Sequence, residues 1–208
     1  MEKIIYILIL IILEHDFYND INIIYKPTTY DFLINKNNKL TNNYVPKDLE
    51  LIDINYACKD KYLRHEARIN FEKLASFAKS EGYNIVAVST YRSYDYQNKI
   101  YNNYVKEKGF YYADMASARA GHSEHQTGLA VDVADLSLDY DNFENTKEFN
   151  WMKNNAHKFG FIMRYPKASF HITGFKYEPW HYRYVGVDIA TYIYKNNITL
   201  EEYKLINN

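Results

Sequence analysis

The chain has little of several features that mark common protein classes, and each shortage excludes one or more of these classes. It contains a single cysteine, Cys58, among 208 residues, so it cannot form an internal disulfide. Lys and Arg number 25 against 26 Asp and Glu, which gives a formal net charge of −1. That balance provides no electrostatic basis for binding nucleic acid or an anionic membrane surface. The sequence has no glycine-rich phosphate loop, and no nucleophile elbow surrounds Ser123.

Long apolar runs are also scarce, and the one near the N-terminus is short. Residues 4–13 form an unbroken apolar run of ten that follows Lys3. A membrane-spanning helix needs about 20 such residues, whereas ten is typical of the apolar part of an export signal. We interpret residues 1–29 as a signal-like or anchor-like segment with a connector, which would tether the protein to a membrane. The alternative is a buried strand or helix of the folded domain, which we place at residues 30–208.

The chain does contain two short segments rich in metal-ligating side chains, about fifty residues apart. They are Ser123-Glu124-His125-Gln126-Thr127-Gly128-Leu129-Ala130-Val131-Asp132 and Glu178-Pro179-Trp180-His181. A catalytic zinc site needs three nitrogen or oxygen ligands and one open position. It also needs a carboxylate that stays off the metal and takes a proton from the metal-bound water. His125, Asp132 and His181 can fill the three ligand positions, which leaves Glu178 as the base.

The residues around Asp132 indicate a strand that begins after a bend. Leu129, Val131 and Val133 are apolar at every second position, a period that predicts a half-buried strand with Asp132 on its other face. A strand running unbroken from His125 would put the histidine and Asp132 on opposite faces. We therefore expect a bend at Gly128, where glycine permits a tight turn.

The second segment follows the same period, and both segments have plainer explanations. His181 lies between apolar Trp180 and Tyr182 on a predicted strand, and Glu178 precedes that strand. Taken singly, Asp132 could be a hydrogen-bonded or ion-paired core residue, His181 a core histidine, and Glu178 an exposed loop acid. The metal interpretation depends on all of them meeting in space.

Periodicity and capping signals predict the remaining elements. Residues 64–81 form an amphipathic helix that stops at Gly82, and a strand over 85–89 leads to Arg92. Ser93 caps a helix over 94–108, and Asn145 with Glu148 resembles a capping box for a helix that ends near residue 160. Strands over 161–164 and 180–184 and a helix over 188–196 follow, with Thr199 capping a short terminal turn. Because strands and helices do not alternate regularly, we expect an α+β fold with a central antiparallel sheet flanked by helices.

Together these motifs resemble the VanY-type D-alanyl-D-alanine carboxypeptidases, which are zinc peptidases of bacterial peptidoglycan. The fold of that family is shared with lysostaphin-type endopeptidases and the hedgehog signalling domain. The family pattern Ser-x-His-x-x-Gly-x-Ala-x-Asp is complete at residues 123–132, and Glu-x-Trp-His is complete at 178–181. A third element, Tyr-Arg-Ser with a Gln four residues after the Ser, occurs at residues 91–97. The similarity extends from about residue 30 to about residue 186.

The resemblance implies a role for each matching residue. One Zn²⁺ would be ligated by His125, Asp132 and His181, with Glu178 as general base and later general acid. Arg92 would lie near the metal and hold a substrate carboxylate or the oxyanion.

Two further residues and the substrate also follow from the resemblance. Gln97 and Ser123 would line the substrate pocket. The expected reaction is removal of the C-terminal D-alanine from peptidoglycan stem peptides or precursors, with D,D-specificity preferred over L,D-specificity. The alternatives are a peptidoglycan endopeptidase of the phage-lysin type and a non-catalytic zinc-containing cell-wall-binding module. The substrate would place the protein outside the cytoplasm, in the cell envelope of a bacterium.

Overall fold

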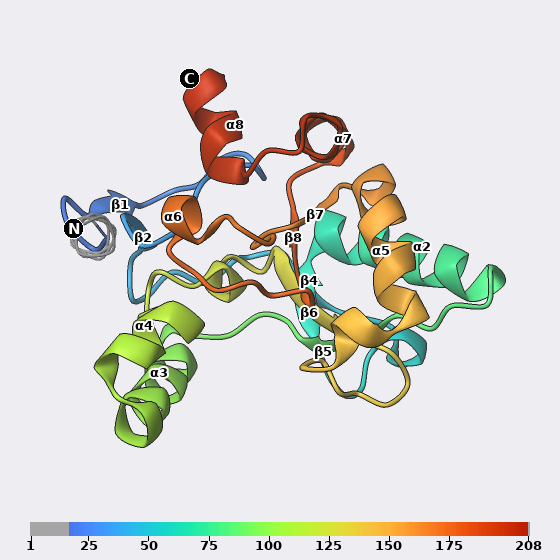
Figure 1. Cartoon of the computed structure of the whole chain (residues 1–208), viewed down its shortest axis with the longest axis horizontal. Coiled ribbons are helices and arrows are strands. Elements are labelled where there is room, and N and C mark those ends of the chain that lie inside the picture. The colour runs from blue at the N-terminus through green and yellow to red at the C-terminus, as the bar shows by residue number, and fades with distance from the viewer. Residues whose placement is uncertain (1–16, 208) are drawn as a thin grey trace, which may run out of the picture.

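The computed structural model describes residues 17–207, so the apolar run predicted at residues 4–13 lies outside the described residues. Short strands and helices follow one another along this part of the chain (Figure 1). The strands are β1 (Asn22–Ile24), β2 (Asn38–Leu40), β3 (Leu49–Leu51), β4 (Tyr62–Arg64), β5 (Val86–Ser89), β6 (Ala130–Ala134), β7 (Phe161–Met163) and β8 (His181–Tyr184). The α-helices are α2 (His65–Ser80), α3 (Tyr94–Lys108), α4 (Phe110–Ala116), α5 (Lys147–Asn155), α6 (Phe170–Thr173), α7 (Val187–Asn196) and α8 (Leu200–Ile206). Short 3₁₀ turns complete the set: η1 (Ile54–Tyr56), η2 (Glu124–Thr127), η3 (Phe143–Asn145) and η4 (Ala156–Phe159).

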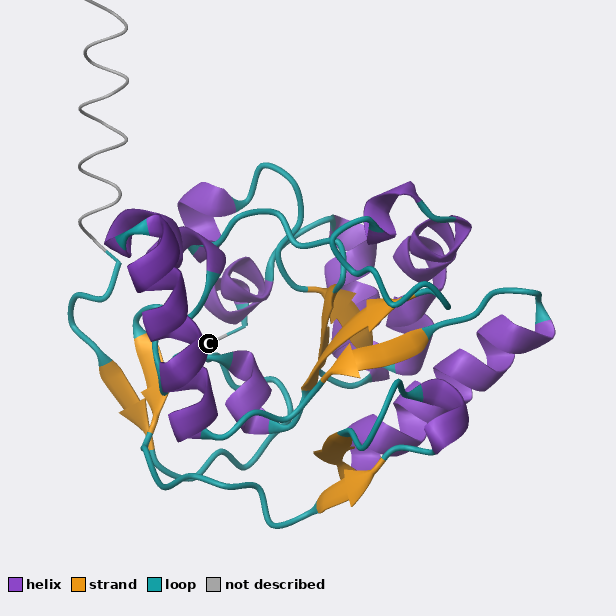
Figure 2. Cartoon of the chain, turned by 90° about the horizontal axis from the view of Figure 1, so that it is seen from below, coloured by secondary structure: helices purple, strands orange, loops and turns teal. Residues whose placement is uncertain are grey.

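A four-stranded sheet with the order β5-β6-β8-β7 lies at the centre of the molecule (Figure 2). Every neighbouring pair in it is antiparallel, which confirms the predicted α+β fold with a central antiparallel sheet. The pairs β1–β2, which is parallel, and β3–β4, which is antiparallel, lie outside this sheet. Helices α2 and α5 group beside the central sheet, whereas α3 and α4 group at another end of the molecule (Figure 1).

One face of the central sheet forms the main core. Side chains of β6 and β8, among them Val131 and Tyr182, pack in one apolar cluster with Phe71 and Leu74 of α2. The period of two along β6 is therefore real, but the prediction that the strand is half-buried is wrong. All five residues of β6 are buried, because other parts of the chain also cover the second face. Arg183 on that face donates to the carbonyl oxygens of residues 30 and 32 and to the Glu124 carboxylate.

The first two predicted helices are confirmed almost to the residue. Helix α2 buries the predicted apolar face, which consists of Ala67, Phe71, Leu74, Ala75 and Ala78. Helix α3 begins at the predicted cap, where the Ser93 hydroxyl accepts a hydrogen bond from the Tyr96 N–H, and it ends at Gly109. This cap fixes the start of α3 immediately after Arg92.

The predicted cap of the third helix is wrong by one residue. The Thr146 hydroxyl, rather than Asn145, accepts the hydrogen bond from the Phe149 N–H at the start of α5. Asn145 instead belongs to the turn η3, which closes through a hydrogen bond from the Thr146 N–H to the carbonyl of residue 143. Glu148 consequently does not complete a capping box, and its carboxylate accepts from the Asn84 N–H at 3.2 Å.

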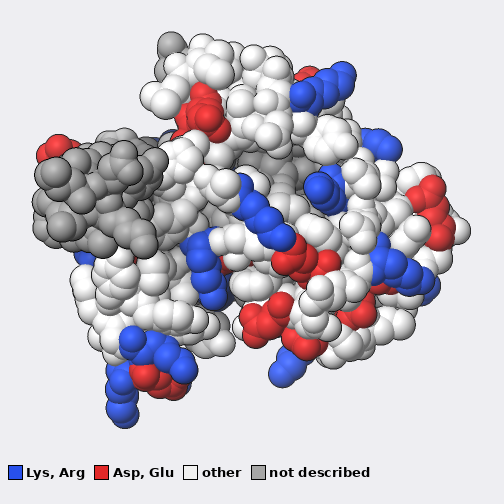
Figure 3. Space-filling model, in the orientation of Figure 1, with Lys and Arg blue, Asp and Glu red and all other residues white. Residues whose placement is uncertain are grey.

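Surface charge and helix length give two further facts about the described chain. On the face shown in Figure 3, basic and acidic side chains are interspersed, which agrees with their nearly equal totals. Between residues 17 and 207, every helix is too short or too polar to cross a bilayer.

Candidate active site

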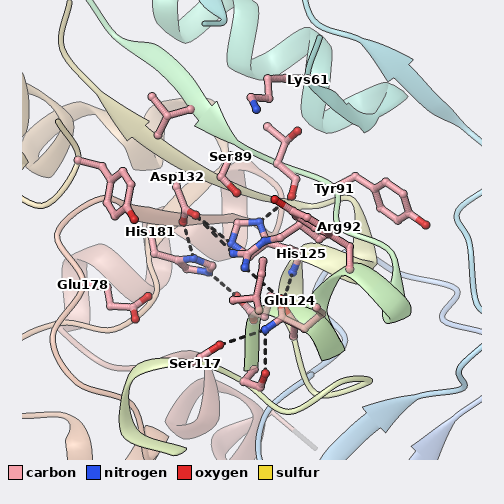
Figure 4. Close-up of a pocket in the computed structure, with 18 of the residues that line it drawn as sticks. Lys61, Ser89, Tyr91, Arg92, Ser117, Glu124, His125, Asp132, Glu178 and His181 are labelled. Atoms are coloured by element: carbon pink, nitrogen blue, oxygen red, sulfur yellow. Dashed lines mark hydrogen bonds and ion pairs between the residues drawn. The ribbon is translucent and has the colours of Figure 1, made fainter. Parts of the chain in front are cut away.

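A cavity of about 440 Å³ opens over the second face of the sheet. Its lining includes every residue that the sequence predicted for the site: Arg92, Gln97, Ser123, His125, Asp132, Glu178 and His181. These residues come from segments far apart in the chain. Figure 4 shows the side chains of Arg92, His125, Asp132, Glu178 and His181 together around the pocket. The close-up shows Glu178 beside His181, while Arg92 lies on the other side, next to His125.

The three predicted metal ligands converge because of two local features. Asp132 of β6 and His181 of β8 are direct cross-strand partners, so their side chains share one face. His125 reaches the same face through the turn η2, which ends at Gly128 with a left-handed φ of 69°. The predicted bend is thus confirmed. One ligand atom from each of the three side chains lies within 4.8 Å of the other two.

The hydrogen bonds of His125 show that the cluster fits a cation. Its Nδ1 lies 2.7 Å from the carbonyl oxygen of Thr90, and since a carbonyl only accepts, Nδ1 carries the hydrogen. The buried Nε2 therefore presents a lone pair toward Asp132 Oδ2 at 3.2 Å, and it has no hydrogen-bond partner among the described residues. Burial and the nearby Arg92 lower the pKa of His125 to about 4, so the ring is neutral at pH 7. Two lone pairs that face each other in this way are suited to a metal ion between them.

His181 sits between two carboxylates. Its Nδ1 lies 2.9 Å from Asp132 Oδ1, and its Nε2 lies 3.2 Å from Glu124 Oε2. Burial by itself would lower the pKa of His181, but hydrogen bonds to Asp132 and Glu124 outweigh burial and raise the pKa to about 9. Burial would likewise raise the pKa of Asp132, yet the two histidines hold that pKa well below its usual value. The metal-free site therefore keeps Asp132 ionised and ready to bind a cation.

Glu178 lies in the loop before β8 and is buried rather than exposed. Its N–H donates to the carbonyl of Tyr165 at 3.1 Å, and its carbonyl accepts from the His181 N–H at 3.2 Å, so the backbone fixes its position. Burial raises the pKa of Glu178 to about 7; His181 opposes this shift and Asp132 adds to it. A carboxylate with a pKa near the working pH can both accept and return a proton. This is the property that a general base beside a metal site requires.

Arg92 and Gln97 are held as a pair at the wall of the pocket. Arg92 Nη1 donates to Gln97 Oε1 at 2.9 Å, and Arg92 Nη2 lies 3.5 Å from Asp132 Oδ2. Gln97 in turn donates to the carbonyl of Ala118 at 2.8 Å. Gln97 thus orients the Arg92 guanidinium toward the three predicted metal ligands.

Ser123 lines the pocket and also makes a hydrogen bond within the chain. Its hydroxyl accepts a hydrogen bond from the His125 N–H at 3.3 Å and so caps the turn η2. This contact supports a metal ligand. Substrate contacts for Ser123, Gln97 and Arg92 stay predictions.

Glu124 was not predicted from the sequence, although its side chain is completely buried and contacts His181. It also accepts from Arg164 Nε at 2.8 Å and from Arg183 Nη1 at 2.7 Å. The sequence contained a signal for some acidic partner, but not for which one, because Arg183 lies within a predicted strand. A buried guanidinium needs a carboxylate partner.

Converging nitrogen and oxygen ligands beside an unligated buried carboxylate define a metal-dependent hydrolase. Comparison with known protein families gives the family: the VanY model, described as D-alanyl-D-alanine carboxypeptidase, matches residues 60–187. The chain belongs to the VanY family of D-alanyl-D-alanine carboxypeptidases and is a metallocarboxypeptidase. The family resemblance expected from the motifs is confirmed.

Relatives and solved structures agree with this family over most of the chain. The putative carboxypeptidase YodJ of Bacillus subtilis (strain 168) is 43% identical over 204 residues, covering 92% of this chain and 75% of YodJ. The structure of the LdcB LD-carboxypeptidase superposes with a TM-score of 0.77 at 45% identity, covering 82% of this chain and 83% of that one. A variant of the D,D-pentapeptidase VanY from a VanB-type resistance cassette superposes with a TM-score of 0.72 at 33% identity, covering 84% and 98%. That structure is a complex with Zn(II), which together with the His-Asp-His cluster confirms zinc as the cofactor.

Proposed function

We propose that the protein removes the C-terminal D-alanine from peptidoglycan stem peptides or their precursors. The observation that carries the proposal is the buried Glu178 beside the cluster of His125, Asp132 and His181. A non-catalytic cell-wall-binding module has no use for a proton shuttle at this position. The buried glutamate therefore favours an enzyme over a binding module.

The residues of the pocket divide the work of hydrolysis. Zinc, when bound by His125, Asp132 and His181, lowers the pKa of a bound water to about 7 and polarises a carbonyl. Glu178 accepts the proton of the attacking water and delivers it to the leaving amine. Because burial holds the pKa of Glu178 near 7, the carboxyl group can serve in both steps.

Arg92 supports a cut at the end of the peptide rather than inside it. A guanidinium matches the two oxygens of a terminal carboxylate, and one amino group of Arg92 is already fixed by Gln97. The Arg92 guanidinium, held beside the three predicted metal ligands, would bind the carboxylate of the last residue of the substrate. Cleavage would then fall on the peptide bond before that residue. An endopeptidase has no terminal carboxylate to place there.

Two substrates compete within this proposal. The motif-based preference is D,D-cleavage, in which a pentapeptide loses its last D-alanine. The second candidate is L,D-cleavage of a tetrapeptide, and it is favoured by the identity of 45% to the LdcB LD-carboxypeptidase against 33% to the D,D-pentapeptidase VanY.

Defined muropeptides test the proposal. The zinc-loaded protein is incubated with tripeptide, tetrapeptide and pentapeptide muropeptides, and the products are identified by mass. Release of D-alanine from the pentapeptide supports D,D-cleavage, and release from the tetrapeptide supports L,D-cleavage. Internal cuts would support the endopeptidase instead, and absence of any cleavage would refute the enzyme proposal.

Two variants separate catalysis from metal binding in the same assay. Glu178→Ala should keep its zinc and lose activity by about 10²–10⁴-fold, the usual contribution of a general acid–base group. His181→Ala should lose both zinc and activity. Parent-like activity in Glu178→Ala would favour another base.

We also propose that the protein works in the cell envelope of a bacterium, outside the cytoplasm. The location of peptidoglycan and the apolar run at residues 4–13 support this. Fractionation of cells that express the full chain, or a form without residues 1–16, tests it. Equal recovery of both forms in the cytoplasm would contradict it.

A further inference from the structure

A cluster of four buried charges lies against the metal ligand His181, on the side away from Asp132. Two carboxylates and two guanidinium groups form it, in Glu124, Arg164, Arg183 and Glu201. The side chains of the first three are fully inaccessible to solvent, and that of Glu201 is 10% exposed. Burial would raise the pKa of Glu124, but Arg164 and Arg183 hold that pKa well below its usual value, so the carboxylate is ionised.

The two carboxylate oxygens of Glu124 have different partners. Oε1 accepts from Arg164 Nε at 2.8 Å and from Arg183 Nη1 at 2.7 Å. Oε2 is directed at His181 Nε2, 3.2 Å away. Arg164 is held from its other end by Glu201, through contacts of 2.6 and 2.7 Å. The arginines therefore prevent the carboxylate from rotating, and Oε2 keeps its orientation toward the histidine.

We propose that Glu124 is a positioning residue that fixes the tautomer of His181. Both ring nitrogens face carboxylate oxygens, which only accept, so the protonated ring donates from Nε2 to Glu124 and from Nδ1 to Asp132. Asp132 belongs to the predicted metal ligands, whereas Glu124 is held in place by two arginines. A metal would therefore take Nδ1, beside Asp132, and Nε2 would keep its hydrogen toward Glu124.

The two histidines of the site thus present different nitrogens to the metal. His125 presents Nε2, because its Nδ1–H is held by a backbone carbonyl, and His181 presents Nδ1, because its Nε2–H is held by Glu124. Partners of this kind orient metal-binding histidines and raise their basicity. The inference deepens the proposed function because it rests on zinc-dependent chemistry at this site.

The substitution Glu124→Gln tests the tautomer with almost no change of shape. The amide oxygen must replace Oε1, since both arginines donate there, so the NH₂ group replaces Oε2 and faces His181. An NH₂ group donates, and His181 Nε2 would then have to accept. The hydrogen of the neutral ring would move to Nδ1, the atom that should bind zinc.

Glu201→Gln is the matched control. It removes one carboxylate from the same buried cluster, but Glu201 bonds Arg164 and Asn35 rather than His181. Both variants should be less stable to heat than the parent, because each leaves a buried positive charge without its full compensation. Only Glu124→Gln should affect the metal ligand directly.

Zinc affinity is measured with Zn²⁺ alone, by competition with a chromophoric chelator. We expect Glu124→Gln to bind zinc about 10–100-fold more weakly than the parent, the usual effect of losing such a partner. Glu201→Gln should stay within about threefold of the parent. Parent-like affinity in Glu124→Gln, or equal losses in the two variants, would overturn the proposal.

A second measurement needs no variant, in case Glu124→Gln does not fold. ¹⁵N NMR of the zinc-loaded parent, labelled at histidine, should show a hydrogen on Nε2 of His181 and metal on Nδ1. The reverse assignment would overturn the proposal. Neither measurement uses peptide cleavage, so a protein that cleaves no muropeptide can still show the weakened zinc affinity and the Nε2 hydrogen.

Discussion

Among single residues, the buried carboxylate of Glu178 sets the pH range of the proposed reaction. Burial raises its pKa to about 7, and only the ionised form can take a proton from water. The active fraction is therefore complete above the pKa and falls about tenfold per pH unit below it. A bound dication favours the ionised form and lowers the pKa. We expect kcat/KM at saturating zinc to decline on the acid side with an apparent pKa at or below 7.

The pH profile needs a check on the metal, since acid also displaces zinc from histidine. Zinc content is measured across the same pH range, and only points at full occupancy are used. A flat profile at full occupancy down to about pH 4, where an ordinary carboxylate titrates, would contradict the assignment of Glu178 as the base.

The raised pKa of His181 leads to a second prediction, on the number of protons that the protein releases when it binds zinc. The two carboxylates raise its pKa to about 9, so the metal-free ring is protonated at pH 7, whereas His125, with a pKa of about 4, is already neutral. A metal-bound ring must lose the proton on its ligating nitrogen. We expect His181 to contribute about one released proton per zinc at pH 7. Glu178 and the zinc-bound water, with pKa values near 7, add to this release.

Titration calorimetry in buffers of different ionisation enthalpy measures this release. The control is the same titration above pH 9, where His181 has already lost its proton and the total release should fall by about one proton. An equal release at the two pH values would contradict a protonated His181 in the protein without zinc.

A single site residue could be predicted from the sequence where its motif lies within a few neighbouring residues. His125, Asp132 and His181 could be predicted because each belongs to a short motif with a fixed spacing. Glu124 could not, because its partners Arg164 and Arg183 lie 40 and 59 residues further along the chain. Beside a histidine in a predicted loop, a glutamate is usually solvated, and only the folded chain shows that it is surrounded by cations.

At the scale of elements, the bend between η2 and β6 depends on Gly128. A Cβ at this residue would lie 2.9 Å from Leu49 Cδ2 and 3.0 Å from Arg64 Cγ, with φ at +69°. We expect Gly128→Ala to lower the free energy of unfolding by about 2–4 kcal/mol, from the left-handed backbone and the two close contacts. Zinc affinity should also fall, because His125 and Asp132 lie on either side of the bend.

Gly82→Ala is the control that separates the cost of the left-handed backbone from the cost of the close contacts. Gly82 has a φ of +86°, but its added Cβ would meet no atom within 4 Å. This control should lose only about 1–2 kcal/mol and keep the zinc affinity of the parent. Urea unfolding of both variants measures the difference, and equal losses would show that the contacts at Gly128 are relieved without cost.

Elements were predicted well where their signals were long or chemically specific. Helix α2 carries an apolar face along its whole length, and helix α3 begins at a serine cap. Both helices begin where expected. The start of α5 was misplaced because Asn145 and Thr146 are both good caps, and the turn η3 decides between them. Strands β1 to β4 have three residues each, which is too short for a period of two to be recognised.

For the whole molecule, the antiparallel sheet is what joins distant motifs into one site. Asp132 and His181 are 49 residues apart in sequence but adjacent across β6 and β8. The similarity to a known family predicted this outcome, whereas periodicity alone predicted only two strands of unknown order. Strand order depends on which faces are covered, and here residues 30–32 cover the face that carries Arg183. Such coverage arises only in the folded chain.

Because zinc ligands come from η2, β6 and β8, metal binding should stabilise the whole fold. An unfolded chain cannot hold the three side chains together, so zinc binds the native state and adds RT ln(1 + [Zn]/Kd) to the free energy of unfolding. That is about 2.7 kcal/mol at a free zinc concentration of 100 Kd. For a domain of this size we expect Tm to rise by about 5–10 °C relative to the chelated protein. Thermal unfolding of parent, Glu178→Ala and His181→Ala measures the shift: the first two should share it, His181→Ala should lack it, and an unchanged Tm in the parent would show that the three ligands do not act together in the native state.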